Sequence, residues 1–250
     1  TATGTDNVAI GEAAGDALTS GADNTFVGDN AGGANTTASN NVAVGSAALL
    51  VNTTGASNTA VGINALDANT TASYNTAIGD NALGATTTGG ENTALGSTAG
   101  AANTTGANNV FIGREAGTAN TTASSNTFVG ERAGAANTTG DESVAIGQYS
   151  YSANTTGVDN VAVGRSALAA NTTASNNVAI GRAALLSNTT GTRNTSVGAL
   201  ALTSATTADN NTAVGYDALG DVTTGANNTA MGDRAGDKLT TGASNTAIGG

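Results

Sequence analysis

The 250-residue chain has 18 acidic residues against seven Lys and Arg, and it contains no Pro, Cys, His or Trp. A net charge of −11 with so few cations argues against nucleic-acid binding, because no continuous basic stripe can form. Without Cys there are no disulfides and no thiolate metal sites. No apolar run reaches the roughly 18 residues needed to span a membrane.

One motif, Asn-x-x-apolar-Gly, recurs every 17 residues from Asn7 to Asn245, with Ser143 replacing Asn once. We number the 17 repeat positions from this Asn. The consensus is N-[TV]-A-[VI]-G-x-x-A-[LG]-x-A-N-T-T-[GA]-x-x, and no insertion interrupts it. A helix-turn-helix repeat needs roughly 33 residues, so this shorter unit favours one coil of a β-solenoid.

In the first coil the sequence predicts a strand over 7–11, a turn at Gly11, a shorter second strand over 13–17 and a turn over 18–23. Each later coil repeats this order. The aliphatic residues at position 4 are expected to form a continuous core, and the Asn column at position 1 to form amide ladders. A helix is disfavoured because Gly, Thr and Asn punctuate every coil.

The predicted fold class is therefore all-β: a parallel β-solenoid of about 15 coils, forming a single repeat array over 1–250. The array starts and stops within a repeat and carries no polar capping segment, which solenoids normally require. We expect it to be a segment of a longer array.

Position 3 holds Ala in eleven coils, Phe in three and Ser in one. Both faces of the predicted strand are thus largely apolar, although a thin coil has one interior. Position 3 is predicted to be either core or a contact with a second copy, represented by Phe26, Ala43, Ala60, Ala94, Phe111 and Phe128.

The three Phe residues occur in coils that have Gly at position 9, namely Gly32, Gly117 and Gly134. Elsewhere position 9 is mostly Leu. This pattern indicates volume compensation between touching positions, either within one chain or between chains.

The N-T-T triplets match the glycosylation sequon, either as a column of glycans or as one ancestral turn copied along the array. The asparagines concerned are Asn35, Asn52, Asn69, Asn103, Asn120, Asn137, Asn154, Asn171 and Asn188. No cofactor is expected, apart from weak surface Ca²⁺ at Asp141-Glu142 or at Asp233 and Asp237. No nucleophile stands with a positioned base, so an enzyme is not expected.

The unit Ser143-Val144-Ala145-Ile146-Gly147 and the N-V-A-[VI]-G units after it resemble the head repeats of trimeric autotransporter adhesins. The resemblance implies a left-handed parallel β-roll that trimerises through its inner strands. Those repeats are shorter, near 14 residues, so each coil here carries an extended N-T-T turn. The longer pattern also looks like arrays in phage tail fibres and large bacterial surface proteins.

These features predict a non-enzymatic extracellular or cell-surface fibre segment, either structural or adhesive. Its expected partners are further copies of itself and a host-surface, matrix or glycan receptor. A phage-type tail fibre shaft is one alternative. The other is an ice- or polysaccharide-binding solenoid, which the Thr pairs suggest, although adjacent Thr residues in a strand would point opposite ways.

Overall fold

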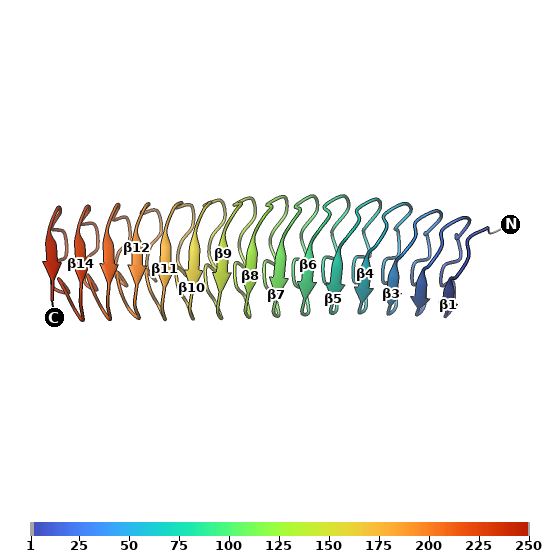
Figure 1. The fold of residues 1–250 in the computed structure, drawn as a ribbon, viewed down its shortest axis with the longest axis horizontal. Helices are drawn as coiled ribbons and strands as arrows, with labels where there is room; N and C mark the ends of the chain where they lie inside the picture. The colour runs from blue at the N-terminus through green and yellow to red at the C-terminus, as the bar shows by residue number, and fades with distance from the viewer. Residues whose placement is uncertain (1–2, 250) are drawn as a thin grey trace. The chain divides into compact units, whose positions relative to one another are not determined.

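The computed structural model describes residues 3–249. It shows an all-β parallel β-solenoid with a 17-residue repeat and no helix within that range. Each coil contributes one three-residue strand (Figure 1). The chain divides into two compact units, Thr1–Ser125 and Asn126–Gly250, while the sequence repeat continues unbroken through both.

The strands occupy positions 2 to 4 of every coil. The first unit contains β1 (Val8–Ile10), β2 (Thr25–Val27), β3 (Val42–Val44), β4 (Thr59–Val61), β5 (Thr76–Ile78), β6 (Thr93–Leu95) and β7 (Val110–Ile112). The second contains β8 (Thr127–Val129), β9 (Val144–Ile146), β10 (Val161–Val163), β11 (Val178–Ile180), β12 (Thr195–Val197), β13 (Thr212–Val214), β14 (Thr229–Met231) and β15 (Thr246–Ile248).

Within each unit every strand pairs in parallel with the next strand in sequence. The pairing is in register with the repeat, so that Ala43 lies beside Ala60 and Ala60 beside Ala77. Identical repeat positions therefore stack in columns, and each column can be considered as one structural site.

The predicted second strand at positions 7 to 11 is wrong, because this segment is a series of turns. Positions 7, 9 and 17 have φ between 51° and 64°, including Leu49 and Asn64. These turns still bond to neighbouring coils: Leu49 N–H donates to Ala65 O at 2.9 Å, and Asn64 N–H donates to Ser46 O at 3.1 Å. Left-handed residues thus replace the extended backbone while the coils stay hydrogen-bonded.

Glycine at position 5 is required by the stacking of the coils. Gly45 has φ 134°, a conformation that side chains rarely adopt. A Cβ added there would also lie 2.5 Å from the carbonyl oxygen of Gly62 in the next coil. Both constraints recur along the column, which explains why no other residue occurs at position 5.

The interior is filled from positions 3, 8 and 9, where Ala43, Ala48 and Leu49 are fully buried. The expectation that position 4 forms the core is wrong. Ile146 and Ile180 are 41% and 40% exposed, and the rest of the column is exposed or half-buried. Because side chains alternate along a strand, those at position 3 point inward and those at positions 2 and 4 point outward. The inner strand face is therefore built mainly of small Ala.

The Phe–Gly correlation arises from packing inside the chain. A Cβ on Gly32 would lie 2.6 Å from ring carbons of Phe26 in the same coil. A Cβ on Gly15, in the preceding coil, would lie 2.9 Å from the same ring. Each ring therefore occupies the space of two position-9 side chains, which also explains Gly15 and Gly100, each of which precedes a coil with Phe.

Two columns of buried Asn form a polar seam inside the solenoid. At position 1, the backbone N–H of Asn41 donates to Asn24 Oδ1 at 3.0 Å. In the same column Asn92 Nδ2 donates to Asn75 Oδ1 at 3.2 Å, in the amide ladder that the sequence predicts. At position 12, Asn52 Nδ2 donates to Asn35 Oδ1 at 2.9 Å. The Nδ2 groups of Asn41 and Asn52 both donate to Gly55 O. The seam thus satisfies buried backbone and side-chain groups together.

The seam is incomplete where the Asn column is interrupted. Asn69 Oδ1 and Asn188 Oδ1 are buried and accept no hydrogen bond. The coils that follow them have Thr86 and Ala205 at position 12, and neither supplies the amide donor that Asn would.

In the one coil that lacks Asn at position 1, Tyr151 supplies the hydrogen bond that this Asn makes elsewhere. Ser143 is too short to reach Gly157 O, and the fully buried Tyr151 hydroxyl donates to that oxygen instead, at 2.8 Å. Asn160 Nδ2 donates to the same hydroxyl at 2.6 Å. Burial raises the pKa of Tyr151 to about 12, opposed by its hydrogen bonds to Ser143 and Asn160.

Candidate functional site

The predicted core or interface column at position 3 lies inside the chain. Each of its representatives is at most 1% exposed: Phe26, Ala43, Ala60, Ala94, Phe111 and Phe128. A contact with a second copy through these side chains is therefore sterically blocked in the folded chain. Any contact on this strand has to use positions 2 and 4.

The sequon asparagines lie in the position-12 seam, which favours the second of the two alternatives, a turn copied along the array, over a column of glycans. All nine are fully buried: Asn35, Asn52, Asn69, Asn103, Asn120, Asn137, Asn154, Asn171 and Asn188. A glycan would have to be attached at Nδ2, which here donates to the position-15 carbonyl, as from Asn171 to Ala174 O at 3.1 Å. The folded coil leaves no space for such a group.

In each unit the outer side of the strands is an uncharged, regular surface, which we call the strand face: the side chains at positions 2 and 4 of the strands of that unit. Position 2 is Thr or Val and position 4 is Val, Ile, Leu or Met throughout. Ile78 and Leu95 are 38% and 46% exposed. Exposed polar and charged side chains at positions 6 and 17, such as Asp80 and Asp23, border this face.

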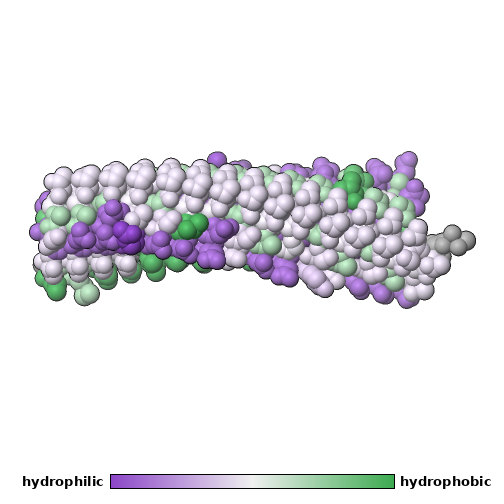
Figure 2. All heavy atoms as spheres, turned by 90° about the horizontal axis from the view of Figure 1, so that it is seen from above, coloured by the Kyte–Doolittle hydropathy of each residue, from purple (hydrophilic) through white to green (hydrophobic). Residues whose placement is uncertain are grey.

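Two threonine columns follow the seam. Thr53 Oγ1 at position 13 donates to Thr70 O at 3.1 Å, and this bond recurs between most neighbouring coils. The Thr residues at position 14, such as Thr54, are exposed. This segment is a bend, so the expected alternation of a strand does not apply, and one column rather than two faces solvent. Figure 2 shows one side of the molecule, where residues of intermediate hydropathy predominate and strongly hydrophilic residues form separate clusters.

The acidic residues do not gather into a recognisable metal site within the described range, where no three of them come together. Lys238 Nζ lies 3.2 Å from an Asp221 oxygen and 3.5 Å from an Asp237 oxygen. Asp237, named above as a weak Ca²⁺ ligand, therefore faces an ammonium group. Residues 3–249 also contain no helix able to cross a membrane.

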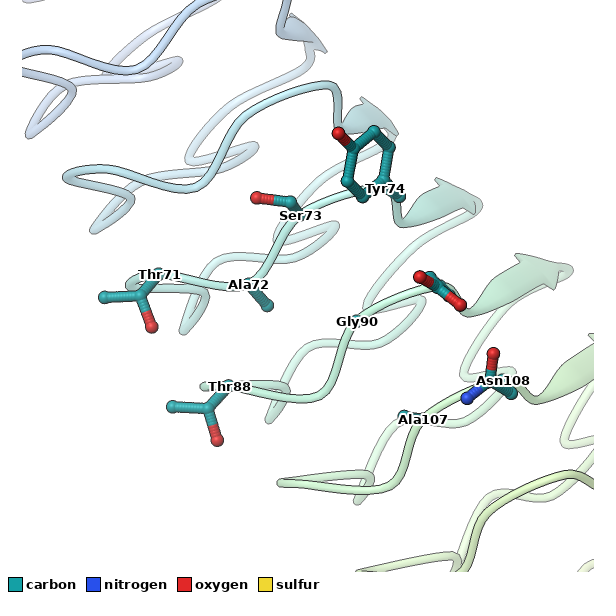
Figure 3. A pocket seen from close by; sticks show the side chains of 9 residues that line it. Thr71, Ala72, Ser73, Tyr74, Thr88, Gly90, Ala107 and Asn108 are labelled. Carbon is teal, nitrogen blue, oxygen red and sulfur yellow. The ribbon is translucent and has the colours of Figure 1, made fainter.

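A groove of about 360 Å³ crosses three coils of the first unit, and we call it the Tyr74 groove (Figure 3). It is lined by Thr71, Ala72, Ser73 and Tyr74 of one coil, by Thr88, Gly90 and Glu91 of the next, and by Ala107 and Asn108 of the third. Tyr74 is 66% exposed, more than any other aromatic residue of the described chain. The labelled sticks in Figure 3 show Thr71 and Thr88 at one end of the lining segments and Tyr74 and Asn108 at the other end, next to the strands.

Sequence reasoning missed this groove because it looked for regular columns. The signal lies in departures from them: Tyr74 is the single aromatic residue at position 17, and Gly90 is the single Gly at position 16. A second hollow, of about 230 Å³, is lined by Arg165, Ser166, Arg182, Ala183 and Leu186.

Comparison of the chain with protein-family models, curated proteins and solved structures finds no match. The resemblance to adhesin heads and fibre arrays therefore rests on the repeat residues themselves. What the geometry offers is recognition: a regular uncharged face, an exposed column of hydroxyls, and a groove that combines an aromatic ring with hydrogen-bonding groups.

Proposed function

We propose that the chain is a non-enzymatic segment of an extracellular or cell-surface fibre, in which copies of the chain associate through the strand face. The single observation that carries this proposal is the uncharged column pair at positions 2 and 4, which leaves aliphatic side chains such as Ile78 and Leu95 exposed in successive coils. Exposed apolar patches of this kind mark interaction surfaces.

A second copy is the partner that best fits the strand face, because both surfaces then share the same 17-residue period. Each coil offers about 50 Å² of flat face, from the strand spacing and the length of three residues. A standard interface needs about 800 Å² per partner, so useful affinity requires many coils in register. Exposed charges at positions 6 and 17 border the face, as in interfaces with an apolar centre and a polar rim.

The resemblance to adhesin heads and tail-fibre arrays supports the fibre setting, including a phage-type shaft as one form of it. The role would be presentation, since a stack of hydrogen-bonded coils can hold other domains apart and repeat a weak contact many times. Repetition raises avidity without any single tight site. A host-surface, matrix or glycan receptor is the partner we propose for such contacts.

The test is the mass of the native particle in solution by light scattering. We expect a multiple of 23.6 kDa for the natural sequence and a shift toward 23.6 kDa for Ile78→Glu, with affinity lowered about tenfold or more. The matched control is Ile63→Glu, since Ile63 is 57% exposed at position 6, outside the strand face. A natural chain that stays monomeric, or two variants that behave alike, would refute self-association through this face.

The exposed Thr column favours an ice-binding solenoid as a second candidate. It supplies one hydroxyl per coil at the coil spacing, on side chains that include Thr54 and Thr71. Thermal hysteresis of a monomeric solution would support this function. Its absence at high protein concentration would eliminate it.

A further inference from the structure

We propose that the Tyr74 groove binds a neutral saccharide, stacking one sugar ring on the Tyr74 side chain. The groove lies on the turns that precede β5, β6 and β7, beside the strand face and not on it. The proposal goes beyond self-association and does not depend on it. It rests on four features: the exposed ring, the open floor, the hydrogen-bonding walls and the lack of cations.

The exposed ring is unusual in this chain, which has three Phe and four Tyr in total. The Phe side chains and Tyr151 are buried, whereas Tyr74 is 66% exposed. Its φ is 63°, a left-handed conformation that is unfavourable for a bulky residue and that other coils assign to Asn, Asp, Ser, Glu or Arg. A flat aromatic face also matches the apolar C–H face of a sugar ring.

The open floor comes from Gly90. In several other coils a Ser at position 16 accepts the N–H of the preceding coil: Ala56 N–H donates to Ser73 Oγ at 3.0 Å, and Ala107 N–H to Ser124 Oγ at 3.1 Å. Gly90 has no side chain that could accept a hydrogen bond from the Ser73 N–H in the same way. A Cβ added to Gly90 would lie 2.9 Å from Ser73 O and 3.9 Å from Ser73 N, so it would occupy this part of the floor.

As a result, the groove floor has two backbone donors. Within the described residues neither the Ser73 N–H nor the Gly90 N–H donates to a protein acceptor, since Ala107 also lacks a suitable side chain at position 16. Consecutive coils are about 4.8 Å apart, so the two donors can reach different hydroxyls of one sugar ring. Open N–H groups of this kind orient ligands in otherwise smooth pockets.

The walls supply the complementary groups. Glu91 and Asn108 follow Tyr74 at position 17, and their backbone N–H groups are fixed by bonds to Ser73 O and Gly90 O at 3.1 and 3.2 Å. A carboxylate accepts two or more hydroxyl protons and an amide both donates and accepts. The exposed Thr71 and Thr88 provide hydroxyls on the opposite wall.

The charge of the lining decides the class of saccharide. Glu91 is its one ionisable carboxylate, and no Lys or Arg lines the groove. Sialylated, sulfated or phosphorylated glycans would be repelled, whereas neutral ones keep all the contacts above. A volume of about 360 Å³ falls at the lower end of the range for ligand pockets, which fits one or two sugar residues of a longer neutral chain.

The experiment is saturation-transfer NMR and calorimetry on the full chain with neutral hexasaccharides of glucose, mannose and N-acetylglucosamine. We expect at least one to bind, with affinity independent of salt. Tyr74→Asn, which installs a residue found at position 17 of other coils, should weaken binding about tenfold. Gly90→Ser, which installs a residue found at position 16 of other coils, should weaken it similarly by capping Ser73 N–H.

The matched control is Tyr216→Asn, because Tyr216 is 44% exposed and lies outside the groove. Binding by this variant should equal that of the natural chain. Failure of all three hexasaccharides at millimolar concentration overturns the proposal. So does equal loss in Tyr74→Asn and Tyr216→Asn, or binding that weakens steeply with salt. Repeating the titration with Ile78→Glu separates this result from self-association.

Discussion

Replacing Gly32 with Leu should destabilise the coil that contains Phe26, and combining it with Phe26→Ala should cost less than the sum of the two single substitutions. The Cβ that this substitution adds to Gly32 would by itself lie 2.6 Å from ring carbons of Phe26, nearer than Cβ contacts come. The backbone is not the cause, since Gly32 has φ 59° and Leu49 takes φ 54° at the same repeat position. Overpacking of this kind costs about 1–3 kcal/mol.

The second single variant, Phe26→Ala, should cost about 3–5 kcal/mol, because it empties a fully buried site. The double variant has Ala and Leu at positions 3 and 9, as in the coil of Ala43 and Leu49. We expect a favourable coupling of about 2–3 kcal/mol between the two substitutions. A residual loss should persist, because Gly15 also faces the ring and would border a void.

The assay is urea unfolding of the natural chain, both single variants and the double variant, with amide hydrogen exchange in the coil of Phe26 as a local readout. Local exchange is needed because repeat arrays unfold in parts. Strict additivity of the two substitutions would refute the packing explanation for the Phe–Gly correlation.

Three further outcomes follow from the polar seam and from the threonine columns that follow it. The pKa of Tyr151 is raised from 10 to about 12, so the neutral hydroxyl stabilises the folded chain fully below pH 10. The free energy of unfolding should fall by about 3 kcal/mol as the pH rises through 12. Unfolding of Tyr151→Phe should lack this pH dependence. Asn52→Ala should cost about 1–3 kcal/mol in urea unfolding, since it leaves Asn35 Oδ1 without its donor. Thr53→Val should lower the melting temperature by removing the bond to Thr70 O, whereas the exposed Thr54→Val should leave it unchanged.

The period, the parallel stacking and the strand at positions 2 to 4 could be predicted because they follow from the spacing of Asn and Gly. The compensation between Phe26 and Gly32 was also readable, since buried volume must be conserved. The glycines that depart from this pairing could not be predicted. Gly15 shares its coil with Ala9, and the Phe26 ring that fills the space beside Gly15 belongs to the next coil. That contact requires knowing which positions meet across coils.

The side of the strand that faces inward could not be predicted from hydrophobicity. Val and Ile at position 4 suggested a core, yet apolar residues also make up much of any protein surface, so their presence does not define the inside. The inner face is set by Ala43 and its equivalents, which leave room for Leu49 opposite. Leu49 itself takes a left-handed φ that propensity disfavours, which is why the turn over positions 7 to 11 was predicted to be extended.

The sequons show the same limitation for polar residues. Asn at position 12 matched a surface modification motif, but a column of identical amides can bond to itself through the interior. Asn35 and Asn52 do so at 2.9 Å, and they also share acceptors with the Asn column at position 1. The deciding factor is the stacking of coils, which a motif within one repeat does not contain.

The same stacking indicates where function can reside in such a chain. Positions 1, 3, 5, 8 and 12 are held by contacts between neighbouring coils, so a change there acts first on stability. Exposed positions are free of that constraint, and a departure from the column at those positions calls for a different explanation. Tyr74 and Gly90 are two such departures in adjacent coils, and both line one groove. Replacing Tyr74 with Asn, which other coils carry at position 17, should therefore preserve the melting temperature while weakening saccharide binding, which is the opposite of what substitution in the seam should do.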